Sequence, residues 1–149
     1  MFNNFLALAL LAGPVLANYH CMTNLGKFDI TANVAQTAMN NGGTSTATEK
    51  SGYPHEFRGT SRKNTRVIFY GSDPRCNQRN PSLLEYPVFR NGEKYVKDKE
   101  HGHTETPARV VYFVDSNKPR LCGVMTHVIE DPKDHHGSGD FRVCDWSSS

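Results

Sequence analysis

The stretch RVVYFVDSNKPRLCGVMTH, residues 109–127, has the pattern of two buried strands joined by a turn. An apolar run of β-branched and aromatic residues follows Arg109, and a second apolar run ends at His127. Between them, Asp115-Ser-Asn-Lys-Pro119 has the composition of a turn. The pattern therefore predicts a pair of neighbouring strands in which a polar side chain marks one end of each apolar run.

Working outward from this pair, we expect one helix on its N-terminal side, over residues 28–43. Asp29 can cap the helix and Gly42-Gly43 can end it, and one apolar stripe contains Ile30, Val34 and Ala38. The remaining short runs with alternating apolar residues predict strands at Tyr53–Phe57, Val67–Tyr70, Leu83–Phe89 and Asp140–Cys144.

Asn91-Gly92 predicts a hairpin between Val88-Phe89 and Tyr95-Val96. One helix followed by strands with short turns indicates an α+β fold. We expect a single domain with the helix packed on one face of a twisted antiparallel sheet.

The N-terminal residues indicate the cellular compartment in which the protein is found. Residues 5–12 are apolar but too few to span a membrane, and Val15-Leu16-Ala17 offers a signal-peptidase site. We expect residues 1–17 to be a signal peptide and residues 18–149 to be a secreted, extracellular monomer without stable membrane association; a buried N-terminal helix is the alternative. The net charge of +2, from 17 Lys+Arg against 15 Asp+Glu, excludes a histone-like polycation but leaves room for a local basic patch.

The four cysteines are Cys21, Cys76, Cys122 and Cys144. An even number in a secreted chain indicates two disulfides, although spacing alone cannot choose among the possible pairings. A zinc site is the competing interpretation, but no Cys-x-x-Cys spacing supports it.

Four polar groups lie within or at the ends of these apolar strands: His55, Glu85, Arg109 and His127. One or two such groups are usually hydrogen-bonded core residues, since an unpaired charge is costly there. Four together favour an acid–base pair with an anion clamp. Without an acidic cluster for a metal, such a set suits cleavage of RNA, whose 2′-hydroxyl supplies the nucleophile.

Five motifs, in this order, resemble the fungal extracellular ribonucleases with guanyl or purine preference, and most closely their ribotoxin branch. They are Tyr53-Pro-His55, Leu84-Glu-Tyr-Pro87, Ala108-Arg-Val-Val111, Gly123-Val-Met-Thr-His127 and Phe141-x-x-Cys144. The resemblance extends over residues 21–145, which is nearly the whole chain after the expected signal peptide.

The resemblance implies catalytic roles for the matched residues. Glu85 corresponds to the general base for the 2′-hydroxyl, His127 to the general acid for the 5′-oxygen, and His55 to the residue that assists the base. Arg109 corresponds to the phosphate clamp, and Tyr53 and Phe141 to the residues that position and enclose the phosphate.

The resemblance further implies the disulfides Cys21–Cys144 and Cys76–Cys122. The implied product is a 2′,3′-cyclic phosphate that is later hydrolysed to a 3′-phosphate, without a metal or another cofactor.

The segment after His55 departs from the family pattern. Phe57 keeps an aromatic residue, but Arg58-Gly-Thr-Ser61 lacks the carboxylate that recognises guanine, so the base preference is open. Residues 57–82 carry six basic side chains and one acidic side chain, a local charge of +5. This excess is either a solvated surface loop or a patch that binds structured RNA through Phe57, Arg58, Arg62, Lys63 and Arg66, with Phe69 and Tyr70 available for stacking.

Three functions follow as alternatives. The first is an endoribonuclease acting on single-stranded RNA, and the second is a ribotoxin that cuts the sarcin–ricin loop of ribosomal RNA. The third is a secreted fungal effector that acts by binding, whose signature Tyr19-x-Cys21 resembles. The retained acid, base and clamp weigh against a non-catalytic scaffold. Four histidines are expected to face solvent in loops rather than bind metal, namely His101, His103, His135 and His136, and Trp146 has no assigned role.

Overall fold

The structure, a computed structural model, describes residues 17–47, 50–97 and 104–148. The signal-peptide prediction therefore lies outside the described residues, apart from Ala17, as do the predictions for His101 and His103. No helix among the described residues is long and apolar enough to cross a membrane.

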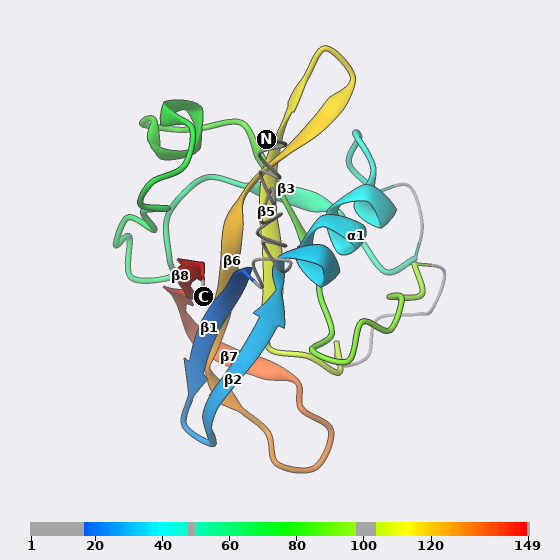
Figure 1. The fold of residues 1–149 in the computed structure, drawn as a ribbon, viewed down its shortest axis with the longest axis vertical. Helices are drawn as coiled ribbons and strands as arrows, with labels where there is room; N and C mark the ends of the chain where they lie inside the picture. The colour runs from blue at the N-terminus through cyan, green and yellow to red at the C-terminus, as the bar shows by residue number, and fades with distance from the viewer. Residues whose placement is uncertain (1–16, 48–49, 98–103, 149) are drawn as a thin grey trace, which may run out of the picture.

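The strands form two antiparallel sheets (Figure 1). The smaller sheet has the order β2-β1-β8, and its strands are β1 (Ala17–Thr23), β2 (Gly26–Thr31) and β8 (Asp145–Ser148). The larger sheet has the order β3-β4-β5-β6-β7, and its strands are β3 (His55–Phe57), β4 (Leu83–Pro87), β5 (Ala108–Asp115), β6 (Lys118–Glu130) and β7 (Gly137–Val143). The expected α+β class with an antiparallel sheet is confirmed.

The helix α1 (Ala32–Gly42) begins later than the sequence pattern predicts. Its N-cap is Thr31, whose hydroxyl accepts a hydrogen bond from the Val34 N–H at 3.2 Å, and not Asp29. Asp29 instead lies in β2, opposite His20 of β1. Cross-strand hydrogen bonds hold this segment extended, so tertiary pairing overrides the helical spacing of its apolar residues.

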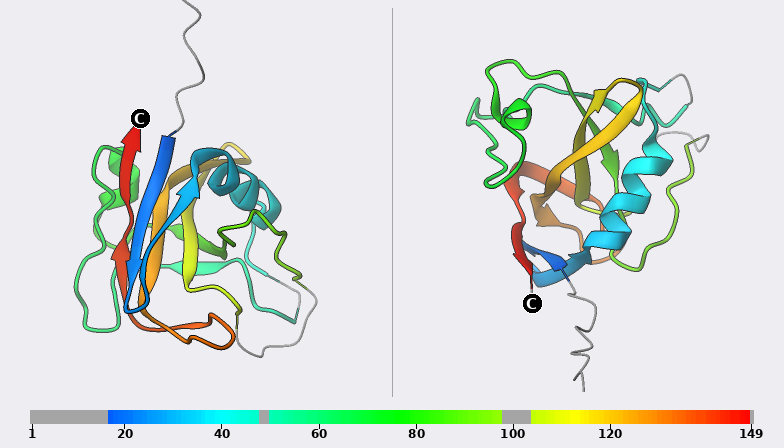
Figure 2. Two further views of the ribbon diagram at one scale, coloured as in Figure 1. Left: turned by 60° about the horizontal axis from the view of Figure 1, so that its bottom comes forward. Right: turned by 45° about the horizontal axis from the view of Figure 1, so that its top comes forward.

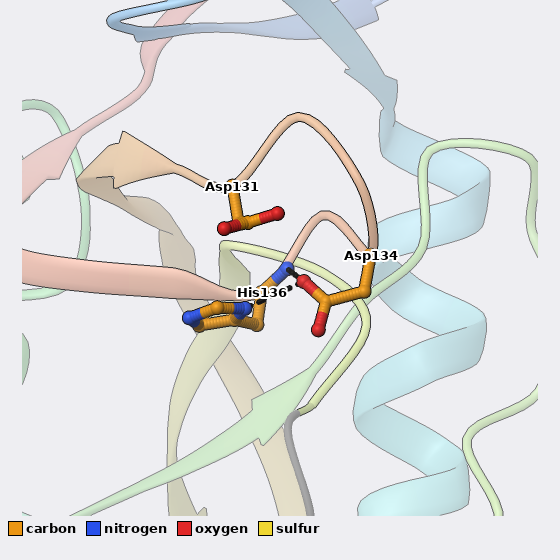
Figure 3. A group of neighbouring side chains, drawn as sticks. All are labelled: Asp131, Asp134 and His136. Atoms are coloured by element: carbon orange, nitrogen blue, oxygen red, sulfur yellow. Dashed lines mark hydrogen bonds and ion pairs between the residues drawn. The ribbon is translucent and has the colours of Figure 1, made fainter.

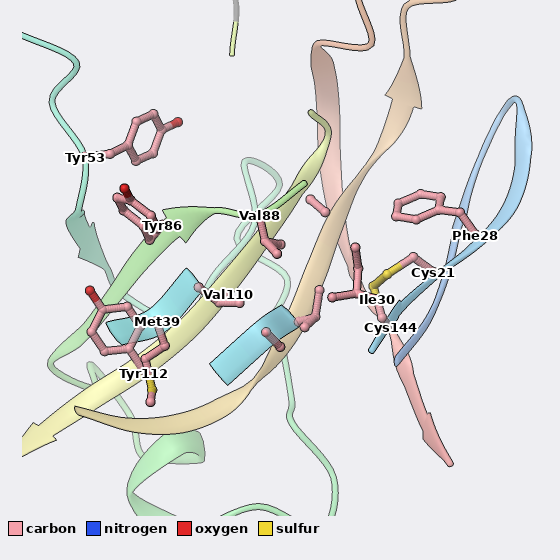
Figure 4. Close-up of a cluster of buried hydrophobic side chains, with 13 residues drawn as sticks. Cys21, Phe28, Ile30, Met39, Tyr53, Tyr86, Val88, Val110, Tyr112 and Cys144 are labelled. Atoms are coloured by element: carbon pink, nitrogen blue, oxygen red, sulfur yellow. A yellow bond between two sulfur atoms is a disulfide. The ribbon is translucent and has the colours of Figure 1, made fainter. Parts of the chain in front are cut away.

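The main core lies between α1 and one face of the larger sheet (Figure 4). Ala35 and Met39 of the helix are buried there with Val110 of β5. At the far end of the helix, the Tyr112 hydroxyl donates to the Gly43 carbonyl at 2.8 Å. The helix thus covers one face of the sheet and leaves the opposite face to another part of the chain.

That opposite face carries a second core, covered by residues 58–82 (Figure 2, right). Phe69 of this segment is 2% exposed, and a Cβ at Gly123 of β6 would come within 2.8 Å of its ring. Glycine at that position therefore lets the segment pack directly on the sheet. The short 3₁₀ helix η1 (Pro74–Asn77) and the Cys76–Cys122 disulfide attach the segment to β6.

Several other predicted elements differ from the structure. Val67–Tyr70 is not a strand, because its backbone bonds to Gly59 and to the side chain of Asn77 rather than to a neighbouring strand. Asn91-Gly92 does form a turn, but no strand includes Tyr95-Val96. Strands β1, β2 and β8 were not predicted from the sequence pattern. The two expected disulfides are present as Cys21–Cys144 and Cys76–Cys122, with sequence separations of 123 and 46.

Candidate active site

The strand register places the predicted catalytic side chains on one face of the larger sheet. His55 pairs with Glu85, and Glu85 lies opposite Val111. Arg109 lies two residues before Val111, so it shares that face, and it pairs with Met125. His127 lies two residues after Met125 and pairs with Phe141. Residues from all five strands therefore converge beside the second core.

The first element of the site is a histidine–carboxylate pair. His55 Nε2 and Glu85 Oε1 are hydrogen-bonded, with His55 exposed and Glu85 only 5% exposed. The other carboxylate oxygen, Oε2, is buried and has no hydrogen-bond partner among the described residues. Because a buried polar atom without a partner is costly, this oxygen is prepared to accept a proton or a hydrogen bond from a bound molecule.

The second element is the buried guanidinium of Arg109, which is 3% exposed. Its Nη1 donates to the carbonyls of Thr106 and Ala108, both at 2.9 Å, and its Nη2 donates to the Tyr53 hydroxyl at 3.3 Å. Its Nε is buried and has no partner in the described part of the chain. Neutral acceptors orient the side chain but leave its positive charge uncompensated, which suits binding of an anion.

Aromatic rings enclose both histidines. The Tyr53 ring stacks on His55 at a centroid distance of 4.5 Å, and the Phe141 ring packs against His127 at 4.1 Å. On another side of His127, a Cβ at Gly137 would come within 2.5 Å of the imidazole. Residue 137 must therefore be glycine for the ring to keep this position.

His127 is held in one tautomer by the backbone. Its Nδ1 is 3.1 Å from the Gly139 carbonyl oxygen, which can only accept, so Nδ1 carries the hydrogen and Nε2 is the position that gains or loses a proton. Burial lowers the pKa of His127 to about 4, and the charge of Arg109 is the next largest cause. The Gly139 carbonyl and Glu85 act in the opposite direction, and Arg62 contributes a smaller lowering.

The lowered pKa predicts an acid-sensitive contribution to stability. Between pH 6.5, the ordinary pKa of histidine, and about 4, the unfolded chain binds a proton at residue 127 that the folded protein does not. The free energy of unfolding should therefore decrease as the pH is lowered through this window, by up to about 1.4 kcal/mol per pH unit. Urea unfolding of the wild type and of His127→Gln measures this: the wild type should lose more stability in acid, and parallel losses in the two proteins would contradict the pKa.

The predicted substrate-binding residues lie in and near a small hairpin. The Val67 N–H donates to the Gly59 carbonyl and the Ser61 N–H to the Thr65 carbonyl, both at 2.8 Å. We call residues 59–67 the basic hairpin, because Arg62 and Lys63 are exposed at its tip.

Other residues of the predicted substrate set have protein partners. Arg66 donates to the Asn77 carbonyl, and Arg58 lies 3.4 Å from Glu56. Phe57 is buried and makes an edge contact with Phe141 at a centroid distance of 6.2 Å. Phe69 is buried, so of the two aromatic residues considered for stacking only Tyr70 is accessible.

Sequence reasoning missed the backbone groups that orient the site. The carbonyls of Thr106 and Gly139 hold Arg109 and His127, and Gly137 makes room for the imidazole. Gly137-Ser-Gly139 is visible in the sequence as a glycine-rich stretch, but only the β6–β7 register brings it to His127.

One group in the turn after β6 has potential metal ligands (Figure 3). The ligand atoms of Asp131, Asp134 and His136 all lie within 4.8 Å of one another. The Asp134 carboxylate is 2.5 Å from His136 Nδ1 and also accepts the His136 backbone N–H, as is common in a tight turn. His135 is exposed but contacts the buried carboxylate of Glu130 at 2.9 Å. Neither histidine belongs to the group formed by His55, Glu85, Arg109 and His127.

Comparison with known proteins links this arrangement to one family. A family model described as ribonuclease matches residues 17–145. The fold is similar to that of hirsutellin A from Hirsutella thompsonii, with 28% identity, a TM-score of 0.65, and coverage of 89% of this chain and 100% of that one.

Two structures of restrictocin share the fold. The Aspergillus ribotoxin itself matches with 23% identity and a TM-score of 0.64, covering 86% of this chain and 99% of that one. Restrictocin in complex with a 29-mer sarcin/ricin domain RNA analog matches with 20% identity and a TM-score of 0.66, at the same coverage of 86% and 99%. No curated protein matches the chain in sequence.

Proposed function

This chain belongs to the ribonuclease family, and we propose that it is a metal-independent endoribonuclease that cleaves RNA by transesterification. The observation that carries this proposal is the convergence of Glu85, Arg109 and His127 on one sheet face, with buried atoms of Glu85 and Arg109 left without partners. The two disulfides support secretion, because such bonds persist in oxidising compartments.

In the proposed reaction, Glu85 Oε2 accepts the proton of the ribose 2′-hydroxyl. The 2′-oxygen then forms a bond to phosphorus while the bond from phosphorus to the 5′-oxygen breaks. Protonated His127 donates its Nε2 proton to the leaving 5′-oxygen, so the first product is a 2′,3′-cyclic phosphate. Hydrolysis reverses these roles, with His127 accepting a proton from water, and yields a 3′-phosphate.

The other residues act on charge and position. His55, hydrogen-bonded to Glu85, stabilises the carboxylate and can take over its proton. The Arg109 guanidinium stabilises negative charge that develops on the phosphoryl oxygens. Because an anion beside His127 opposes the effect of Arg109 on its pKa, the bound phosphate favours the protonated imidazole that the reaction needs.

A direct test uses an oligonucleotide with one ribonucleotide in an otherwise 2′-deoxy chain. The protein should cleave it after that ribonucleotide, release a 2′,3′-cyclic phosphate detectable by mass spectrometry, and retain its activity in chelator. An all-deoxy oligonucleotide is the matched control and should stay intact. No cleavage by folded protein would overturn the proposed enzyme and favour a protein that acts by binding.

The second candidate function is that of a ribotoxin. The exposed tip of the basic hairpin favours it, since Arg62 and Lys63 are exposed and lie outside the catalytic set. The restrictocin structure with a sarcin/ricin domain RNA analog provides the analogous target, a folded ribosomal RNA element.

Replacing Arg62, Lys63 and Arg66 with serine tests whether the basic hairpin binds folded RNA. Loss of phosphate contacts should lower cleavage of ribosomes or long structured RNA by at least about tenfold and flatten the salt dependence by nearly one log unit per contact. Cleavage of a dinucleotide, which offers a single phosphate and no folded RNA to bind, should fall far less than cleavage of structured RNA.

A matched control removes charge elsewhere on the surface, by changing Lys27 and Lys118 to serine. Both lysines are exposed and lie outside residues 57–82, so this variant should cleave both substrates like the wild type. Equal effects of the hairpin variant on dinucleotide and ribosome would remove its targeting role. One discrete fragment from wild-type-treated ribosomes indicates a ribotoxin, and general degradation indicates a non-specific ribonuclease.

A further inference from the structure

Two exposed aromatic residues line one groove near the candidate active site. Tyr70 is 86% exposed and Trp146 is 51% exposed, and both border a cavity of about 350 Å³. Its lining comes from residues 69–72 and from strands β1, β6, β7 and β8. The segment that includes residues 69–72 runs alongside β8 (Figures 1 and 2). Large exposed aromatic side chains in a concave site are typical of ligand recognition, because they offer apolar area that water solvates poorly.

The backbone that presents Tyr70 is firmly anchored. The preceding Phe69 is buried, its N–H donates to the Asn77 side-chain carbonyl at 2.8 Å, and its own carbonyl accepts from the Asn77 amide at 3.0 Å. The Ser72 hydroxyl donates to the same carbonyl at 2.6 Å. Tyr70 therefore points into solvent from a fixed base, and binding through its ring costs little conformational entropy.

Trp146 is held by the smaller sheet. It lies in β8 opposite Tyr19 of β1, and the two rings are in contact at a centroid distance of 4.7 Å. Tyr19 supports one side of the indole, and the exposed half of the Trp146 side chain is available to a partner in the groove.

The groove adjoins a second cavity that extends toward the candidate active site. A second cavity of about 350 Å³ shares Tyr70, Val143 and Asp145 with the first, and its wall includes Phe141. Phe141 also packs against the imidazole of His127, so one wall residue of the second cavity contacts the proposed general acid. Arg66 and Arg142 line it together with Asp140 and Asp145, which makes the lining mixed in charge rather than uniformly basic.

We propose that this groove is a subsite for unpaired nucleotides that flank the cleaved bond, with their bases stacked on Tyr70 and Trp146. The inference rests on the proposed ribonuclease function. Stacking on aromatic rings accepts any base, because every base has a π face, while an arginine such as Arg142 can contact the backbone phosphate. Among the residues that line the first cavity, the one charged side chain is Asp145, so recognition there relies on stacking of unpaired bases. Phosphate contacts would come from Arg66 and Arg142 of the second cavity.

Binding can be measured apart from cleavage with an oligonucleotide that has no 2′-hydroxyl. Because Trp146 is the only tryptophan in the chain, its fluorescence reports on binding in the groove. An all-deoxy oligonucleotide of about eight nucleotides, within the range of single-strand sites, should quench its fluorescence in a saturable manner. Tyr70→Ala should weaken this binding by about tenfold, Tyr70→Phe should retain it, and Leu25→Ala, an exposed apolar residue outside the groove, is the matched control. A neutral oligosaccharide should cause no quenching.

Cleavage supplies the second readout. Tyr70→Ala and Trp146→Ala should each lower kcat/KM for the single-ribonucleotide oligonucleotide by about tenfold and change that for a dinucleotide by less than about twofold. Trp146→Phe, which keeps an aromatic ring in β8, should restore most of the loss.

The results separate this proposal from the one it rests on. Normal dinucleotide cleavage with no effect of either aromatic variant on the oligonucleotide overturns the subsite and leaves the ribonuclease function intact. Quenching by the oligosaccharide but not by the oligonucleotide overturns it in favour of a carbohydrate ligand. Absence of all cleavage by the wild type overturns the enzyme itself, whatever the fluorescence shows.

Discussion

We expect the replacement of Glu85 with glutamine to lower the rate of RNA transesterification by at least about 100-fold, since a general base typically contributes 10²–10⁴-fold. The amide keeps the shape of the side chain but cannot accept the 2′-hydroxyl proton. His127→Gln should have a loss of similar size, because the leaving 5′-oxygen then departs without a proton. Initial rates on the single-ribonucleotide oligonucleotide measure both effects.

Because Glu85 and His127 act in the same step, the double variant should lose less than the product of the two single losses. Glu130→Gln provides a matched control. Glu130 is also a buried carboxylate, 2% exposed, but its partners are Thr23, Arg90 and His135 on another part of the molecule. Wild-type rates in a folded Glu85→Gln or His127→Gln protein would refute the assignment, and a loss in Glu130→Gln as large as that in Glu85→Gln would point to a structural effect.

The second large effect concerns the disulfide between Cys76 and Cys122. Changing both residues to alanine should lower the free energy of unfolding by about 4 kcal/mol, because the bond closes a long loop, with a sequence separation of 46. A typical domain has a total stability of only about 5–15 kcal/mol, so this variant should unfold at a much lower urea concentration. Urea unfolding followed by circular dichroism, against the wild type under non-reducing conditions, gives the difference.

This disulfide also anchors the segment that carries the basic hairpin and Tyr70. Between β3 and β4, that segment has only η1 and one isolated bridge, Thr60 with Arg66, as regular structure. Without the bond, the second core should loosen before the helix side does, and activity should disappear at lower urea than the helical signal. A stability loss below about 1 kcal/mol would show that packing of Phe69 and its neighbours holds the segment without the bond.

The candidate catalytic residues could be predicted from sequence because each interrupts or ends an apolar strand. Glu85 stands out between Leu84 and Tyr86, and Arg109 and His127 mark the ends of two apolar runs. An ionised group in such a place is costly unless the structure uses it. Strand alternation then puts them on one face as soon as the neighbouring strands are paired.

The start of the helix shows where local pattern fails. Ile30 has helical spacing to Val34 and Ala38, and Asp29 is a good N-cap, yet residues 26–31 form a strand. Their partners are residues 18–23, and β1 itself also pairs with β8, which is distant in sequence. The β1–β2 pairing is a tight local hairpin in which Thr23 lies opposite Gly26, whereas the β1–β8 pairing is distant in sequence and leaves no local signal.

By itself, the sequence determined the fold class, the helix, most of the larger sheet, the number of disulfides and the polar residues that converge on one face, because periodicity and burial cost act on neighbouring residues. Only the tertiary structure decided the registers that bring Gly139 to His127, the low pKa of His127, and which of Phe69 and Tyr70 faces solvent. Each of these depends on contacts between segments distant in sequence, where burial, charge and hydrogen bonding are set by packing rather than by local pattern.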